Sequence, residues 1–265
     1  MFKKILKFIG VLALTTLILF IGTFISQKLM IISGLPLTDF QVERYSGTIG
    51  ILTAAISIAV ISHKRGWCKD MKTRRFKIDH RVIPVAFSAI SICTVLVASL
   101  FALAINKILP QASDVSTYKT WLDHVFCILI APIAEELLFR QGIYGALRNS
   151  FNRKAALIIS AVLFTAAHGY QIQGTLQVLL AGLLLAYVFE KTGNIWYSIS
   201  AHMALNAFSS ISNYLVHKGI PFYSEINGYV VYHAAVMAAA IVIIIATFIA
   251  FRKKENKDRV QSPCC

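Results

Sequence analysis

Three charged residues interrupt a long apolar segment and are the first candidates for chemistry in this chain. Glu135, Glu136 and Arg140 lie inside the apolar run 122–147. A charge in the middle of a membrane helix costs roughly 2.5 kcal/mol or more, so such residues normally face a protein interior or a water-filled cavity. Carboxylates in that setting can accept and deliver protons. The rest of the chain is therefore expected to supply partners for them.

Helical spacing predicts different roles for the two carboxylates. Glu136 and Arg140 are four residues apart, so they lie on the same face of a helix and are expected to neutralise one another. Glu135 projects about 100° away from Glu136 around the helix axis. We therefore expect Glu135 to point into a cavity.

Two later apolar segments each carry a histidine in a pair of residues with the same spacing. Phe164 and His168 are four residues apart in the first segment. His202 and Asn206 are four residues apart in the second. At about 1.5 Å per residue from the predicted helix ends, these polar residues and Glu135 lie roughly 11 to 20 Å deep. A lone histidine would suggest packing and a lone asparagine an interhelical bond, but their similar depth favours one shared site.

Composition indicates that these segments are membrane helices. The chain has 265 residues, of which 57% are hydrophobic and 14% are charged. Its mean hydropathy is +0.68, whereas soluble domains have about 25% charged residues. We predict an all-α, polytopic membrane protein with about eight transmembrane helices around a polar intramembrane cavity. The predicted spans are 5–26, 48–62, 82–108, 122–147, 155–170, 175–190, 195–216 and 229–251.

These spans divide the chain into three predicted parts. Residues 1–120 hold the first three helices and a basic loop, and residues 121–212 hold the four helices with the polar residues. Residues 213–265 hold the last loop, the last helix and a basic tail.

The distribution of positive charge predicts the orientation in the membrane. The formal net charge is +14, and most of the 26 Lys and Arg residues fall in loops that alternating helices would place on one side. The positive-inside rule then places both termini in the cytoplasm of a multi-pass cell-membrane protein. We interpret the basic stretch 64–81 as a topology signal with some attraction for lipid headgroups, and we expect no nucleic-acid partner.

The three pairs of spaced residues resemble the motifs of a known family. Their order is Glu135-Glu136-x-x-x-Arg140, then Phe164-x-x-x-His168, then His202-x-x-x-Asn206. This pattern resembles the CAAX protease and bacteriocin-processing family, the Abi-type intramembrane glutamic endopeptidases related to type II CAAX prenyl endopeptidase. The resemblance covers about residues 121–212, and it implies an all-helical membrane fold with a polar chamber and hydrolysis of peptide bonds.

The resemblance also implies a role for each motif residue. Glu135 is expected to be the general base that activates water, helped by His168. His202 and Asn206 are expected to hold and polarise the carbonyl group of the substrate. The remaining motif residues are expected to support the site: Glu136, Arg140 and Phe164.

The sequence leaves two mechanisms open. Glu135, His168 and His202 could form a zinc site with an open position for water. However, the strong zinc signature H-E-x-x-H is absent, and no pair of the five cysteines has metal-ligand spacing. We predict a glutamic mechanism without cofactor, with zinc as the alternative. Ser198 and its neighbouring serines lack the motif context of an activated nucleophile, so a serine mechanism is not predicted.

The leading functional hypothesis is an intramembrane endopeptidase that acts on a membrane-embedded peptide or a lipidated protein. The substrate could be a CAAX-type protein, a leader peptide or a signalling peptide. The alternative is a non-catalytic membrane scaffold with an immunity or regulatory role, for example bacteriocin immunity. An ion-coupled transporter is disfavoured because the sequence shows no paired broken helices in two similar halves.

Overall fold

The computed structural model describes residues 2–67, 120–169 and 172–217, and all regular structure in these residues is helical. Two helices precede the first gap, α1 (Phe2–Ile32) and α2 (Asp39–Lys64). A set of contiguous helical segments follows it: α5 (Trp121–Val125), η1 (Phe126–Ile130), α6 (Ala131–Glu136), η2 (Leu137–Tyr144) and α7 (Gly145–Ser150). The last described helices are α8 (Arg153–His168), α9 (Ile172–Thr192) and α10 (Ile195–His217).

The predicted spans that fall within the described residues are helical, except that the helix predicted over 155–170 ends at His168 and residue 170 is not described. The predicted spans 82–108 and 229–251 lie outside the described residues. Three described helices are long and apolar enough to cross a membrane: Ile5–Ile32, Asp39–Lys64 and Gly174–Thr192. The described part of this membrane protein is thus all-helical, with several candidate spans. The total of about eight spans stays a prediction.

The second span begins nine residues before its predicted start because a capping box sets its first turn. The Gln41 backbone N–H donates to the Thr38 hydroxyl at 3.2 Å, and the Thr38 backbone N–H donates to Gln41 Oε1 at 3.1 Å. These two bonds satisfy donors that the first turn of a helix leaves unpaired. The helix therefore includes a polar first turn that apolar periodicity alone does not mark.

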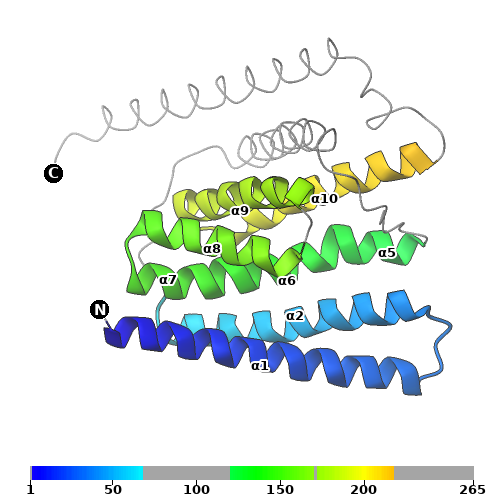
Figure 1. Ribbon diagram of the computed structural model, residues 1–265, viewed down its shortest axis with the longest axis horizontal. Coiled ribbons are helices and arrows are strands. Elements are labelled where there is room, and N and C mark those ends of the chain that lie inside the picture. Colours follow the sequence, from blue (N-terminus) through cyan, green and yellow to red (C-terminus); the bar gives the residue numbers. More distant parts are fainter. Residues whose placement is uncertain (1, 68–119, 170–171, 218–265) are drawn as a thin grey trace, which may run out of the picture.

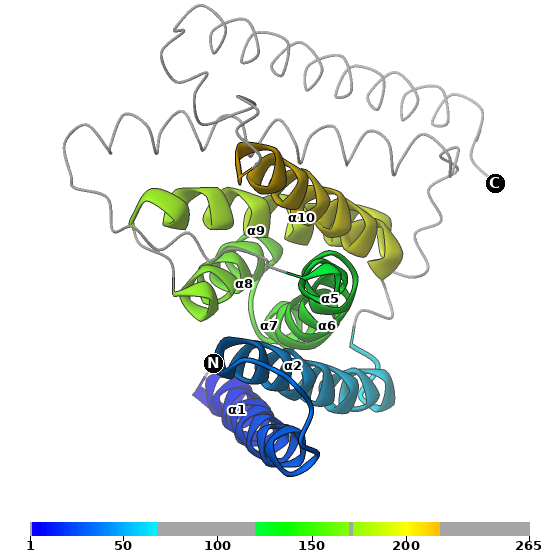
Figure 2. The same ribbon diagram turned by 90° about the vertical axis from the view of Figure 1, so that its right-hand side faces the viewer.

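The segments from Trp121 to Ser150 form one continuous helix, here called the central helix (Figure 1). Its first turn is capped by Thr120, whose hydroxyl accepts from the Asp123 backbone N–H. Segments η1 and η2 are π-helical, so each turn there holds about one more residue than an α-helical turn. Figures 1 and 2 show α1 and α2 on one side of the central helix and α8, α9 and α10 on the other.

Helix α2 lies directly on the central helix. The Tyr45 hydroxyl donates to Asp123 Oδ1 at 2.7 Å, and Ser62 Oγ donates to the Gln141 carbonyl at 3.0 Å. Between these bonds, Ile58 packs against Gly142, where a Cβ atom would lie 2.5 Å from Ile58 Cγ2. One buried and one partly buried hydrogen bond, together with the glycine contact, thus fix α2 along the helix that carries the paired glutamates.

One end of the bundle gathers the positive charge of the described helices. The ring of Phe8 packs edge-on against Phe151 at 6.4 Å, and Arg148 Nε lies 2.8 Å from Glu190 Oε2. The start of α1 and the ends of α7 and α9 therefore share one end of the bundle. The residues at this basic end are Lys7, Lys64, Arg65, Arg148, Arg153, Lys154 and Lys191. This clustering agrees with one-sided positive charge, while the cytoplasmic location of that side stays a prediction.

Helices α1 and α2 approach each other closely through glycine, which yields a test of the packing. A Cβ atom at Gly50 would lie 2.9 Å from the Leu19 carbonyl oxygen, which is backbone and cannot move aside. Gly50→Ala should therefore destabilise the protein by about 1–3 kcal/mol, as overpacking does. Thermal unfolding of the full-length protein in detergent measures this effect.

The matched control is Gly47→Ala on the same helix. A Cβ atom at Gly47 meets nothing within 4 Å, and alanine favours helix over glycine by up to about 1 kcal/mol. This variant should unfold at the same temperature or higher. Equal destabilisation of both variants would contradict the predicted close contact at Gly50.

Candidate active site

The paired glutamates end the short segment α6, between the two π-helical segments. In η1 the Ala131 backbone N–H donates to the Phe126 carbonyl, five residues back. A π-helical turn changes the direction of the side chains that follow it, and such turns often occur at functional sites. The local geometry of the central helix thus sets how Glu135 and Glu136 face the neighbouring helices.

Glu136 is fully buried and binds three side chains. Arg140 Nε donates to its Oε2 at 3.0 Å, which is the ion pair predicted from the four-residue spacing. Ser198 Oγ donates to the same oxygen at 2.5 Å, and His202 Nδ1 lies 3.0 Å from Oε1. Because Ser198 and His202 both come from α10, this carboxylate fixes the position of α10 against the central helix.

Arg140 is fully buried as well, and an aromatic ring supplies part of its environment. Its guanidinium carbon lies 4.7 Å from the centroid of the Phe164 ring, within cation–π range. The same ring contacts His168 at 4.4 Å between centroids. Neither terminal nitrogen of Arg140 has a hydrogen-bond partner in the described residues. The charge is thus compensated by Glu136 and by the face of Phe164.

Glu135 is partly exposed, in contrast to Glu136, and its orientation toward a cavity stays a prediction. Its side chain retains 15% exposure, whereas that of Glu136 has none. Glu135 Oε2 lies 3.6 Å from His168 Nε2 and 3.8 Å from His202 Nε2. Both separations exceed the length of a direct hydrogen bond, and one water molecule could contact all three atoms. The structure therefore brings Glu135, His168 and His202 together from three helices.

The partners of the other ring nitrogens determine which tautomer each histidine adopts when neutral. His168 Nδ1 lies 2.8 Å from the Phe164 carbonyl oxygen, and His202 Nδ1 faces the Glu136 carboxylate. Both oxygens can only accept, so both Nδ1 atoms carry hydrogen. Each neutral imidazole then presents the lone pair of Nε2 toward Glu135. One carboxylate and two basic nitrogens converge on a partly exposed point, an arrangement suited to taking a proton from water.

Asn206 contacts the central helix at a different point. Asn206 Nδ2 donates to the Cys127 carbonyl at 2.8 Å. Neither the α-helical nor the π-helical donor position serves this carbonyl, because the Ala131 N–H donates to Phe126 and Pro132 has no N–H. The Asn206 amide replaces such a donor. Its nitrogen carries two hydrogens, and the bond to Cys127 uses one of them.

Ser198 supports the site, a role that was not predicted from the sequence. It was considered only as a possible nucleophile, yet its hydroxyl donates to Glu136 and lies 3.1 Å from the Leu185 carbonyl. The sequence does place Ser198 four residues before His202 and eight before Asn206, so all three lie on one face of the helix. His124 Nδ1 lies 2.6 Å from Ser210 Oγ and so also links the central helix to α10.

A second polar cluster lies at the basic end and was also missed. The Tyr144 hydroxyl donates to Glu190 Oε2 at 2.6 Å, and Arg148 Nε donates to the same oxygen at 2.8 Å. Glu190 had been interpreted only as the end of its helix. These contacts join the central helix to α9, which the short connection at Gly193 links to α10. The cluster thus helps to place the helix that carries His202.

The donor types around Glu135 match a His₂Glu zinc site in composition. The described residues contain no group of three or more His, Cys, Asp or Glu side chains arranged to hold a metal ion. The zinc alternative and the mechanism without cofactor therefore both stay predictions, to be separated by experiment.

The contact between Asn206 and the carbonyl of Cys127 predicts a coupled pair of mutations. Asn206→Ala removes a donor from a carbonyl inside the bundle, which should destabilise the protein by about 1–3 kcal/mol. Pro132→Ala adds a backbone N–H five residues after Cys127, which is the donor position for that carbonyl in a π-helix. Asn206→Ala should therefore destabilise the protein less in the Pro132→Ala background. Thermal unfolding of the four proteins of a double-mutant cycle measures this difference. Strictly additive effects would contradict the replacement of a missing backbone donor by Asn206.

Comparison with known proteins shows that the segment holding this site is similar to one known family. Residues 117–208 match the type II CAAX prenyl endopeptidase Rce1-like family. The "Putative membrane peptidase YdiL" of Bacillus subtilis (strain 168) is 31% identical over 106 residues, which are 38% of this chain and 43% of that protein. The "UPF0177 protein YxdF" of Lactococcus lactis subsp. lactis (strain IL1403) is 35% identical over 80 residues, 30% of this chain and 44% of that protein.

The two alignments therefore cover less than half of each relative. No solved structure matches the chain. The matched segment contains all three motifs, from Glu135 to Asn206. Residues 117–208 thus resemble the Rce1-like type II CAAX prenyl endopeptidase family, and the resemblance includes all three motifs.

Proposed function

We propose that the protein is an intramembrane endopeptidase that hydrolyses peptide bonds with water activated by Glu135. The observation that carries this proposal is the placement of Glu135 Oε2 within 3.6 and 3.8 Å of two histidine Nε2 atoms. These groups lie in apolar helices, at one partly exposed point of an otherwise buried polar cluster. The family match and the name of the Bacillus subtilis relative support a peptidase rather than another hydrolase.

In the proposed reaction, Glu135 takes a proton from a water molecule that contacts both Glu135 and His168. The hydroxide formed attacks the carbonyl carbon of the substrate, and the carbonyl oxygen becomes an oxyanion. Glu135 then delivers the proton to the leaving amine as the carbon–nitrogen bond breaks. A general base placed in this way typically contributes ~10²–10⁴ in rate.

His202 and Asn206 are the proposed donors to the oxyanion. When protonated, His202 donates from both ring nitrogens, to Glu136 through Nδ1 and toward the Glu135 side through Nε2. Asn206 retains a second hydrogen on Nδ2 beside the one that binds Cys127. Donors held in place before the reaction need no reorganisation, which is why they stabilise an oxyanion efficiently.

The buried residues around the site act as its support. Glu136 holds His202 by Nδ1, Ser198 holds Glu136, and Phe164 holds His168 through its backbone carbonyl. The Phe164 ring also covers the Arg140 charge. These contacts fix the tautomer and ring orientation of both histidines, a common function of residues behind an active site.

A membrane-embedded peptide or a lipidated protein is the proposed substrate. The apolar surroundings of the site favour a segment that enters from the bilayer, such as a CAAX-type, leader or signalling peptide. The proposal includes about eight spans around a polar chamber, with both termini in the cytoplasm of a multi-pass cell-membrane protein.

Glu135→Gln tests the proposed base directly. The amide keeps the size of the side chain and cannot accept the proton, so cleavage should fall by at least about 10²-fold. Peptide mass spectrometry of membranes from cells with the wild-type or the variant protein measures the products that depend on Glu135. The protein level in the membrane should be unchanged.

The matched control is Glu43→Gln, which makes the same change at an exposed position on α2. It should leave the products unchanged. If Glu135→Gln retains full cleavage, Glu135 is not the base. A biological effect that survives Glu135→Gln without any peptide products would favour the non-catalytic scaffold instead.

The metal question is tested with a zinc chelator. A glutamic mechanism without a metal should retain its cleavage rate after the purified protein is incubated with 1,10-phenanthroline. Metal analysis of the same sample should find less than one zinc per protein. Loss of activity that zinc restores, and that the non-chelating isomer 1,7-phenanthroline does not cause, would establish the zinc alternative.

A further inference from the structure

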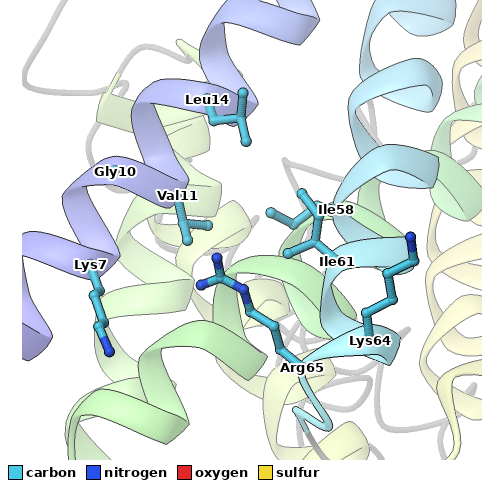
Figure 3. Close-up of a pocket in the computed structure, with 8 residues that line it drawn as sticks. All are labelled: Lys7, Gly10, Val11, Leu14, Ile58, Ile61, Lys64 and Arg65. Carbon is cyan, nitrogen blue, oxygen red and sulfur yellow. The ribbon is translucent and has the colours of Figure 1, made fainter.

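A groove with basic and apolar walls lies between the start of α1 and the end of α2, away from the site at Glu135. It has a volume of about 340 Å³ and opens at the basic end of the bundle. Figure 3 shows the Arg65 guanidinium projecting into the space between the two helices. Lys7 lies on the α1 side of the groove and Lys64 on the α2 side.

The charge of the groove is one-sided. Three of its eight lining residues are cationic, and none of the eight is acidic. All three cations are exposed. Arg65 also lies over the ring of Trp67, with its guanidinium carbon 5.9 Å from the centroid. Tryptophan is enriched at the headgroup level of membranes, so this end of α2 has the composition expected at the boundary between lipid and water.

The deeper wall of the groove is apolar. Val11 and Ile58 are buried there, at 9% and 2% exposure, and Ile61 lies beside them. The neighbouring surface of α1 is apolar and open, since Leu6, Ile9 and Leu14 are between 44% and 58% exposed. An exposed apolar surface on a candidate membrane span is one that acyl chains cover. The groove thus joins a cationic mouth to a surface suited to an acyl chain.

We propose that this groove binds an anionic phospholipid, with its phosphate at the three cations and an acyl chain along the α1–α2 contact. Both halves of the groove are needed for this assignment. A small free anion would use the cations and leave the apolar wall uncovered, whereas a neutral lipid would use the wall and leave the cations without a counterion. Basic residues close to a membrane end attract anionic headgroups in this way.

A lipid in this groove contacts the helix that supports the central helix. Ile58 lines the groove and also packs against Gly142. One turn further, Ser62 donates to the Gln141 carbonyl. The lipid would therefore brace α2 where α2 meets the segment that follows Glu136 and Arg140.

Native mass spectrometry of the full-length protein tests the proposal with two probes. Phosphatidylglycerol and phosphatidylcholine with identical acyl chains are each added to the protein in detergent, and the dissociation constant of the first bound lipid is measured. Phosphatidylglycerol should bind more tightly. The triple variant Lys7→Gln/Lys64→Gln/Arg65→Gln should lose this preference. Each cation removed should weaken the binding of phosphatidylglycerol by about fivefold.

Two further variants separate charge from shape. Gly10→Leu places a larger side chain at a lining position where a Cβ atom meets nothing within 4 Å. This side chain should fill the groove without a clash and weaken the binding of both lipids. Lys28→Gln/Arg44→Gln removes two charges from the opposite ends of the same two helices. It should change the affinity for neither lipid.

The charge-conserving variant Lys7→Arg/Lys64→Arg/Arg65→Lys should keep the preference. It keeps the test valid if the neutral triple variant does not fold. Equal affinity for the two lipids would overturn the proposal, as would unchanged binding in Gly10→Leu. Competition by glycerol phosphate as effective as that by the lipid would also overturn it, because the groove would then be an anion site without a lipid chain.

Discussion

The buried carboxylate of Glu136 is the interaction on which the site depends. A carboxylate and a guanidinium removed from water are costly unless their charges are paired and their remaining groups are bonded. Arg140 supplies the countercharge from the same helix, and α10 supplies two further partners, Ser198 and His202. The same bonds that compensate the buried charge therefore set the position of α10 and the orientation of His202.

The irregular geometry of the central helix also leads to a contact with α10. Pro132 and the π-helical turn before it leave the Cys127 carbonyl without its usual helical donors, and the Asn206 amide donates to that carbonyl. The departure from α-helical geometry thus creates a contact point for α10 on the central helix, eight residues before Glu135. On the opposite side, Ile58 packs against Gly142 and holds α2 along the same helix. The paired glutamates are held between two packed surfaces.

Much of the local organisation could be predicted from spacing in the sequence. The four-residue interval between Glu136 and Arg140 predicted their ion pair, and the angle between adjacent residues predicted that Glu135 faces elsewhere. Ser198 shares the spacing of His202, but its partner is on another helix, so spacing alone did not reveal its bond to Glu136. The early start of α2 was missed because a polar cap, and not apolar periodicity, begins that helix.

The sequence by itself determined the all-helical class, the apolar segments and the three ordered motifs, because these follow from hydrophobicity and from the fixed angle per residue in a helix. The tertiary structure alone decided which ring nitrogen of His168 and His202 faces Glu135, and that Asn206 also binds the Cys127 carbonyl. Helical periodicity specifies a direction around one axis. It does not specify the rotation and the axial offset between two helices, which depend on buried contacts such as those of Glu136.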